Sequence, residues 1–305
     1  EIVETELSAS EVYYQPMGVI LGIMPWNFPF FLIARKMAPA LVTGNTIVVK
    51  PSVDSPINAI LFAEIVHSSG LPKGVFNLVH GAGGEIGQEL AGNPKVGLVS
   101  LTGSEPAGRK VMEAASRNIT KVNLELGGKA PAIVLADANL DLAAKAIVAS
   151  RIINSGQVCN CAERIYVQRE VKEVFTQKLV ELMKKVRLGN PLEDETLDMG
   201  PMVNKQGQLH AQAMVDEAIK AGGRCLLGGH SVKGKGYYFE PTIIDNVTND
   251  MAILRQEIFA PVIPIATFET IDEVIELAND CEYGLTSSIY TQNINEADEY
   301  CTERV

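Results

Sequence analysis

The sequence is short of histidine, of cysteine and of positive charge. It has four histidines, and its 26 Lys and Arg residues are outnumbered by 37 Asp and Glu residues, giving a net charge of -11. Nucleic acids and anionic membranes attract proteins through basic patches, so this charge argues against both as partners. The histidines are scattered, and none forms a recognisable pair with a cysteine, which disfavours a papain-like hydrolase.

The five cysteines are an odd number in a chain of 305 residues, which does not fit the disulfide framework of a secreted protein. A reduced, cytoplasmic setting fits better. Cys159 and Cys161 are separated by one residue, but no second Cys or His pair stands at ligand spacing. No metal site is therefore expected.

A long uninterrupted apolar run is also missing. Residues 17–34 are the most membrane-like, but Pro25, Asn27 and Pro29 interrupt them, which favours a strand, a turn and a helix start over a membrane span. Hydrophobic residues still make up 47% of the chain, which excludes a disordered protein. At about 150 residues per domain, the length predicts two domains.

Apolar strand patterns alternate with amphipathic helix patterns. The expected strands are 18–23, 46–49, 75–79, 97–101, 132–135, 164–167, 242–244, 263–268 and 286–291, and the expected helices are 57–68, 86–91, 107–116, 140–154, 171–186, 205–221, 271–279 and one from 293. This rhythm predicts an α/β fold with a parallel sheet covered by helices. The acidic residues 1–15 alternate like an exposed strand or hairpin, and Gly127 and Gly128 allow the sharp turn expected at a domain boundary.

Cys159 is a candidate nucleophile. It follows a helix pattern and precedes a strand pattern, so it lies near the end of an element, where a thiol can be presented. A thiolate is the strongest ordinary side-chain nucleophile near neutral pH. On position alone, a buried structural cysteine is an equally good interpretation.

Two glycine-containing loops each follow a strand pattern. Gly81, Gly83 and Gly87 approach a dinucleotide fingerprint, although Ile86 occupies the third glycine position. Residues 102–108 form a second loop that enters a helix, where backbone N–H groups can face a pyrophosphate. Either loop alone can be a tight turn without a ligand, but two in one β-α-β array favour a nucleotide.

Several segments together resemble the ordered signature of the NAD(P)-dependent aldehyde dehydrogenases. They are Pro25-Trp26-Asn27-Phe28-Pro29, Lys50-Pro51-Ser52, Thr102-Gly103-Ser104, Leu124-Glu125-Leu126-Gly127-Gly128-Lys129, Gly156-Gln157-Val158-Cys159 and Glu257-Ile258-Phe259. Cys159 follows Glu125 by 34 residues, as in the family pattern. The resemblance runs through the whole chain, and chance agreement of six motifs in order is negligible.

The resemblance implies an aldehyde dehydrogenase-like α/β fold in three parts. Residues 1–16 would form an oligomerisation strand or hairpin, 17–127 a Rossmann-type cofactor domain without its front, and 128–305 an α/β catalytic domain without its C-terminal tail. The chain is thus expected to be an internal fragment of the family length. The full-length protein is expected to be a homodimer or homotetramer.

The resemblance also assigns catalytic roles. Cys159 would attack the aldehyde carbon, and the Asn27 amide and the Cys159 backbone N–H would stabilise the oxyanion. Glu125 would activate the water that hydrolyses the thioester. Taken alone, Asn27 could instead form an Asx turn and Glu125 a salt bridge at a strand end.

For the cofactor, the resemblance places Lys50 at the adenosine ribose, Ser104 at a phosphate, Glu257 at the nicotinamide ribose and Phe259 near the nicotinamide. The remaining members of the expected cofactor set are Trp26, Ser52, Gly83, Gly103 and Gly127. Many NAD-preferring members carry Glu three residues after the lysine, where this chain has Val53. NAD is therefore the expected cofactor, with NADP left open.

The substrate is expected to be an oxygen-rich aldehyde. Arg35 lies eight residues after Asn27, close to two helical turns, and an arginine there suits a hydroxyl or carboxylate group. A surface Arg-Lys pair with Lys36 is the alternative. The sequences around Asn27 and Cys159 look most like those of family members that oxidise lactaldehyde or glycolaldehyde. In this interpretation, Asn160 forms a hydrogen bond with the 2-hydroxyl group of the substrate. The alternative is a succinate-semialdehyde dehydrogenase or an aldehyde dehydrogenase of broad specificity.

Three competing classes are disfavoured by particular residues. CoA-acylating or phosphorylating relatives lack a base at the Glu125 position, because they protect the thioester from water. A non-catalytic protein of the same fold would be expected to lose Cys159 or Glu125. A thiol hydrolase without a nucleotide leaves Lys50 and Glu257 unexplained.

Overall fold

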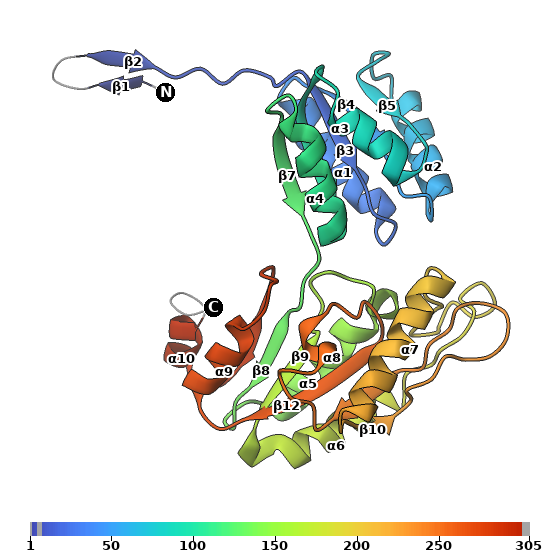
Figure 1. The fold of residues 1–305 in the computed structure, drawn as a ribbon, viewed down its shortest axis with the longest axis vertical. Coiled ribbons are helices and arrows are strands. Elements are labelled where there is room, and N and C mark those ends of the chain that lie inside the picture. Colours follow the sequence, from blue (N-terminus) through green and yellow to red (C-terminus); the bar gives the residue numbers. More distant parts are fainter. Residues whose placement is uncertain (1, 5–7, 301–305) are drawn as a thin grey trace. The chain divides into compact units, whose positions relative to one another are not determined.

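The structure is a computed structural model that describes residues 2–4 and 8–300 (Figure 1). The chain divides into two compact units, Glu1–Leu126 and Gly127–Val305. Within the described residues, no helix is long and apolar enough to cross a membrane. Which unit binds a cofactor and which carries the chemistry stays a prediction.

The first unit is built on a five-stranded parallel sheet. Its elements are β1 (Ile2–Glu4), β2 (Ala9–Glu11), β3 (Val19–Ile23), α1 (Pro29–Val42), β4 (Thr46–Lys50), α2 (Pro56–Ser68), β5 (Phe76–Leu78), the π-helical turn η1 (Gly83–Gly87), α3 (Gln88–Ala91), β6 (Val96–Thr102), α4 (Glu105–Ser116) and β7 (Lys121–Glu125). The sheet order is β5-β4-β3-β6-β7, and β1 and β2 form a separate antiparallel pair. The strand order therefore reverses between β3 and β6.

Both faces of this sheet are covered because its central strands are apolar on successive residues, which point to opposite faces. Ile20 and Ile47 pack with Ile33 of α1, whereas Leu21 and Val99 pack with Val111 of α4. Helices α1 and α2 thus contribute to the core on one face, and α3 and α4 to the core on the other. This is the doubly wound arrangement of a Rossmann-type sheet.

The second unit contains a six-stranded mixed sheet. Its elements are β8 (Pro131–Val134), α5 (Leu140–Ile152), the 3₁₀ turn η2 (Ile153–Gly156), β9 (Arg164–Gln168), the 3₁₀ turn η3 (Arg169–Val171), α6 (Lys172–Met183), α7 (Lys205–Lys220), β10 (Arg224–Leu227), β11 (Thr242–Asp245), α8 (Ala252–Arg255), β12 (Val262–Phe268), α9 (Ile271–Asn279), β13 (Ser288–Tyr290) and α10 (Ile294–Glu299). The order is β10-β11-β12-β9-β8-β13, with only β10 antiparallel to its neighbour among the described strands.

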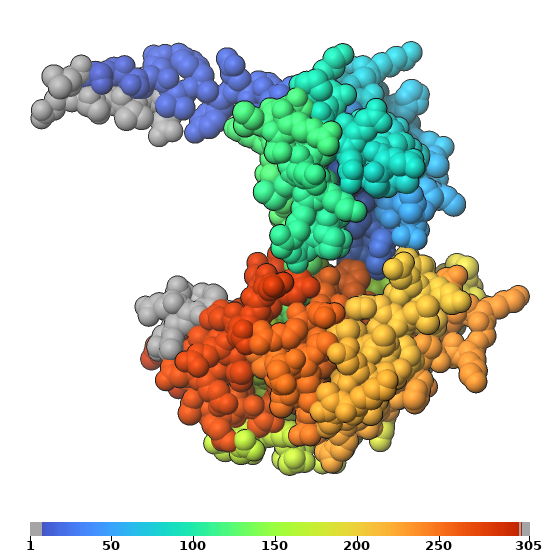
Figure 2. Space-filling view, viewed as in Figure 1, coloured from blue at the N-terminus to red at the C-terminus, as the bar shows by residue number. Residues whose placement is uncertain are grey.

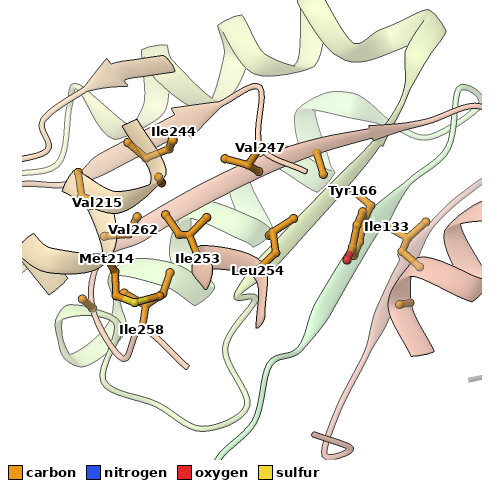
Figure 3. Packing of buried hydrophobic residues seen from close by; sticks show 14 of the residues in the cluster. Ile133, Tyr166, Met214, Val215, Ile244, Val247, Ile253, Leu254, Ile258 and Val262 are labelled. Atoms are coloured by element: carbon orange, nitrogen blue, oxygen red, sulfur yellow. The ribbon is translucent and has the colours of Figure 1, made fainter. Parts of the chain in front are cut away.

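Alternate residues of β8 and β9 again divide the core. Val134 and Val167 face the cluster that contains residues of α5 and α6. Ile133 and Tyr166 face the cluster that contains Met214 of α7 and residues of α8 and α9 (Figure 3). The yellow stretch that includes α7 forms part of the outer surface of this unit (Figure 2).

The predicted α/β class and parallel sheets are confirmed, but two strands were missed. Both β7 and β10 are edge strands. In β7, Lys121 and Asn123 are exposed and alternate with half-buried residues, so the strand lacks the continuous apolar run of a central strand. An edge strand is buried on fewer sides, and its sequence signal is correspondingly weaker.

The predicted helix over 140–154 was wrong at its end. Helix α5 stops at Ile152, and Asn154 and Ser155 then adopt positive φ angles of 47° and 56°. Gly156 follows at φ 74°. Asn and Gly tolerate this left-handed region better than most residues, and the turn redirects the chain toward Cys159.

Candidate active site

The predicted site residues of the first unit lie along one edge of its sheet. Parallel strands end at the same edge, and in a doubly wound sheet ligands bind outside the carboxyl ends, where the strand order reverses. The predicted residues that follow or end these strands are Trp26, Asn27, Lys50, Ser52, Gly83, Gly103, Ser104 and Glu125. The topology therefore places these residues where a doubly wound sheet accepts a ligand.

Lys50 ends β4, and its ammonium group lies near Gly83, the first residue of η1. A Cβ added to Gly83 would stand 3.9 Å from Lys50 Nζ. The Lys50 residue is only 4% exposed, and burial lowers its pKa below the ordinary lysine value. Val53, three residues on, is 62% exposed. A cation beside a glycine-rich loop fits a ribose or phosphate group.

The ends of β6 and β7 are joined beside the start of α4. The Gly103 N–H donates to the Glu125 carbonyl oxygen at 3.0 Å. Ser104 is the residue before α4, so the free N–H groups of the first turn and the positive end of the helix dipole lie at this edge. This arrangement also fits a phosphate.

Glu125 has two cationic neighbours from α1. Arg35 Nη2 lies 3.8 Å from Glu125 Oε1, but the two side chains are 57% and 38% exposed, so this ion pair is weak. Lys36 is buried, and its Nζ donates to Ser100 Oγ at 2.8 Å. Burial lowers the pKa of Lys36 to about 8, although Glu125 acts in the opposite direction.

Lys36 is therefore not the surface partner of Arg35 that the sequence offered as an alternative. The buried residues of α1 are Leu32, Ile33, Lys36 and Ala40. They recur at the three- and four-residue spacing of one helix face. That spacing was the available signal for a buried lysine beside Glu125.

In the second unit, Cys159 follows η2. The structure explains why Gly156 and Gln157 occupy the positions shortly before it. A Cβ on Gly156 would lie 2.3 Å from the Ala260 carbonyl oxygen, so only glycine permits this contact. The Gln157 amide donates to the Asn154 carbonyl at 2.8 Å and accepts from the Val203 N–H at 2.9 Å. The segment leading to Cys159 is thus fixed, and Cys159 itself is half-buried.

The Gly127-Gly128 pair brings Cys159 and Glu257 close to one backbone segment. A Cβ on Gly128 would lie 2.5 Å from the Cys159 carbonyl oxygen, and one on Gly127 would lie 2.6 Å from Glu257 Oε2. The Gly128 N–H donates to Glu257 Oε1 at 3.0 Å. Burial, assisted by the charge of Glu163, raises the pKa of Glu257 to about 7.

The residues that follow Cys159 differ from it in solvent exposure. Cys161 is 2% exposed, Arg151 Nη1 donates to its Sγ at 2.8 Å, and burial raises the pKa of its thiol. A buried protonated thiol is a poor nucleophile. Asn160 is exposed, and its carbonyl accepts from Thr286 Oγ1 at 3.4 Å.

A buried ion cluster of Glu163, Lys129 and Arg151 was not predicted from the sequence. Glu163 is 1% exposed and lies 2.7 Å from Lys129 Nζ and 3.0 Å from Arg151 Nη2. Burial alone would raise the pKa of Glu163, but Lys129 and Arg151 lower it to about 2. Among the described residues, no group of three His, Cys, Asp or Glu side chains is arranged to hold a metal ion.

The chain is similar to several known proteins. The chain is 56% identical to lactaldehyde dehydrogenase from Escherichia coli over 97% of its own length and 62% of that protein, and the crystal structure of that enzyme matches with a TM-score of 0.95 over 99% of this chain and 64% of that chain. D-glyceraldehyde dehydrogenase (NADP(+)) from Picrophilus torridus is 43% identical over 92% of this chain and 57% of its own length. Betaine aldehyde dehydrogenase from Staphylococcus aureus in complex with NAD+ is 36% identical, with a TM-score of 0.96 over 100% of this chain and 61% of that one.

The chain thus spans about three fifths of the length of the relatives it matches. The sequence profile of the aldehyde dehydrogenase family matches residues 2–304, which is almost the whole chain. Its fold, with one parallel sheet and one mixed sheet, matches that of a solved member of the family. The chain belongs to the aldehyde dehydrogenase family.

Proposed function

We propose that the full-length protein oxidises a short hydroxyaldehyde, lactaldehyde or glycolaldehyde, to the carboxylic acid with NAD(P)+ as the oxidant. The observation that carries the proposal is the 56% identity to lactaldehyde dehydrogenase along nearly the whole chain. The chain also keeps a half-buried thiol at Cys159 and a partly exposed carboxylate at Glu125. These are the nucleophile and the base that the reaction requires.

The chemistry of the chain's own residues follows from this assignment. The Cys159 thiolate adds to the aldehyde carbon and forms a thiohemiacetal, while the Asn27 side-chain amide and the Cys159 backbone N–H stabilise the oxyanion. The hydride acceptor is supplied by NAD(P)+ when it is bound. Glu125 takes a proton from the water that attacks the resulting thioester, which releases the acid and frees Cys159.

The proposed cofactor residues suit different ends of the cofactor. Lys50 beside Gly83 and the first turn of α4 after Gly103 fit the phosphate and adenosine end. Glu257 would accept from the nicotinamide ribose in place of the Gly128 N–H. The residue set includes Trp26, Ser52, Ser104, Gly127 and Phe259. The exposed Val53 carries no charge to repel a 2′-phosphate, so we expect turnover with both NAD and NADP.

The preference for a hydroxyaldehyde rests on Arg35 and Asn160. Arg35 carries an exposed guanidinium near Glu125, and Asn160 follows the nucleophile directly. Either side chain can bind a hydroxyl oxygen at C2 of the aldehyde. Arg35→Ala and Asn160→Ala should therefore lower kcat/KM for lactaldehyde more than for propanal. Equal losses on the two aldehydes would contradict recognition of the hydroxyl group.

The test of the reaction is the absorbance of NAD(P)H formed by the full-length protein. Lactaldehyde, glycolaldehyde, succinate semialdehyde and propanal are each supplied with either cofactor. We expect the highest kcat/KM with lactaldehyde or glycolaldehyde. A preference for succinate semialdehyde would instead assign Arg35 to a substrate carboxylate, and no reduction of either cofactor would remove the dehydrogenase assignment.

We further infer a homodimer or homotetramer and a reduced, cytoplasmic location for the full-length protein. The antiparallel pair of β1 and β2 supports the first inference, because β2 is exposed and pairs only with β1 among the described strands, which leaves its other edge for pairing with another chain. None of the cysteines in the described part of the chain, Cys159, Cys161, Cys225 and Cys281, forms a disulfide, which supports the second. Light scattering on the full-length protein and on a variant that lacks only residues 1–16 tests the role of the pair.

A further inference from the structure

Glu163 joins three segments that the proposed reaction uses. Its Oε2 accepts from Lys129 Nζ at 2.7 Å and from the Ile258 N–H at 3.0 Å. Its Oε1 accepts from Arg151 Nη2 at 3.0 Å and from the Phe259 N–H at 2.9 Å. Each oxygen of one buried carboxylate thus receives one cation and one backbone amide. Four donors, two of them cationic side chains, therefore converge on Glu163.

The three segments are short and close to the predicted site in sequence. Glu163 is four residues beyond Cys159, Lys129 follows Gly128 directly, and Phe259 is two residues beyond Glu257. The side chain between the last two, Ile258, belongs to the buried cluster of the second unit (Figure 3). The apolar cluster therefore holds one side of this loop, and Glu163 holds its backbone.

The loop needs such an anchor because its backbone is strained. Phe259 has φ 53°, in the left-handed region that an aromatic residue rarely adopts. The Phe259 N–H is bonded to Glu163 in this conformation. A strained residue persists when its surroundings over-determine it, and here the surroundings include a charged acceptor.

Glu163 is not itself suited to move protons. It is 1% exposed, and the cations beside it keep its carboxylate ionised through the neutral range. Arg151 also donates to Cys161 Sγ and to the Ala162 carbonyl at 3.3 Å, so the same network fixes the chain between Cys159 and Glu163. Whatever Glu163 does for the reaction, it does through the groups it holds.

We propose that Glu163 is a positioning residue that holds the loop Glu257–Phe259 in place relative to Cys159. The inference rests on the dehydrogenase function proposed above, in which Glu257 and Phe259 bind the nicotinamide end of the cofactor. Loss of the carboxylate releases the two backbone amides of the loop. The thiol and the oxyanion-binding groups stay available, but hydride transfer loses its geometry.

This difference separates positioning from simple structural support. Hydrolysis of p-nitrophenyl acetate needs Cys159 as nucleophile and a water that attacks the acetyl thioester, but it needs no hydride acceptor. Oxidation of lactaldehyde needs both the thiol and the loop. A variant in which only the loop has moved therefore loses the dehydrogenase activity and keeps the esterase activity.

The experiment compares Glu163→Gln with Asp245→Asn in the full-length protein. Asp245 is a matched control, because it is also 1% exposed and pairs with two cations, Lys172 at 3.0 Å and Arg224 at 2.9 Å, at the end of β11. An amide at 163 keeps the shape but presents N–H groups to two of the four donors. We expect kcat for lactaldehyde to fall about 10²-fold in Glu163→Gln, as a displacement of about 1 Å can cause.

Esterase activity of Glu163→Gln should stay at the level of Asp245→Asn. Parallel loss of both activities, or loss of neither, in a folded variant overturns the role of Glu163. Should Glu163→Gln not fold, Lys129→Met carries the test, because it leaves Glu163 with Arg151 and both backbone amides and should show the same split more weakly. A wild type that reduces neither cofactor removes the proposed function, and the role of Glu163 falls with it.

Discussion

Replacing Gly128 with alanine tests how closely the backbone around Cys159 is packed. The new Cβ would lie 2.5 Å from the Cys159 carbonyl oxygen and 3.3 Å from Leu285 Cδ2. Non-bonded heavy atoms pack best at about 3.5 Å, so one of the two backbones has to move by roughly 1 Å. The contact is with backbone rather than with the end of a flexible side chain, and rotamer changes alone do not relieve it.

Two consequences follow for Gly128→Ala. A shift of this size at the nucleophile should lower kcat by about 10²-fold. The forced contact in a packed interior should also lower the free energy of unfolding by about 1–3 kcal/mol. The rate of NAD(P)H formation at saturating aldehyde measures the first effect, and thermal unfolding of the same preparation measures the second.

Gly284→Ala is the matched control in the same unit. A Cβ at Gly284 would meet nothing within 4 Å, and the residue is exposed. This substitution should leave kcat unchanged and raise the free energy of unfolding by about 0.4–1 kcal/mol through the unfolded chain. A folded Gly128→Ala variant with wild-type kcat, or equal losses in the two variants, would refute the packing argument.

Four further substitutions probe the cysteines, the Lys50 ammonium group and the Glu257 carboxylate. Cys159→Ser should abolish turnover, whereas Cys161→Ser should retain it because the Cys161 thiol is buried and protonated; equal losses in kcat would contradict this. Lys50→Met should raise KM for the cofactor at least about tenfold with little change in kcat, since it removes a cation from the Gly83 loop, as cofactor titrations would show. The raised pKa of Glu257 means that the folded protein binds a proton more tightly than the unfolded chain, so stability should fall as pH rises from about 4.5 to about 7. The free energy of unfolding should fall by about 3 kcal/mol over this pH range in the wild type, and this fall should be absent in Glu257→Gln. The same pH dependence of stability in the two cofactor-free proteins would contradict it.

The sequence predicted the fold where burial dictates it. The central strands β3, β4, β6, β8, β9 and β12 are apolar on both faces and were found by their apolar runs. The edge strands β7 and β10 were not, because an edge tolerates the polar residues that β7 carries at Lys121 and Asn123. The end of α5 was misplaced because a contact distant in sequence, between Gly156 and Ala260, helps to fix the turn that follows it.

The sequence likewise predicted some residues of the candidate site and missed others. Cys159, Glu125 and Asn27 were found from their motifs, and their roles stay predictions. Lys36 and Glu163 were missed, since Lys and Glu are seldom fully buried and a sequence favours an exposed interpretation. The four donors to Glu163 come from positions 34 and 12 residues before it and 95 and 96 residues after it, so only the folded chain brings them together.

The central claim, covalent catalysis at Cys159 completed by Glu125, is tested most directly by trapping the thioester. Full-length Glu125→Gln is mixed with lactaldehyde and NAD(P)+, quenched in acid and digested for mass spectrometry. The account predicts an acyl group on the peptide that contains Cys159, absent without cofactor and absent in Cys159→Ser. Acid formation by the wild type with no acyl group at Cys159 in Glu125→Gln, or with the acyl group on Cys161, would contradict it.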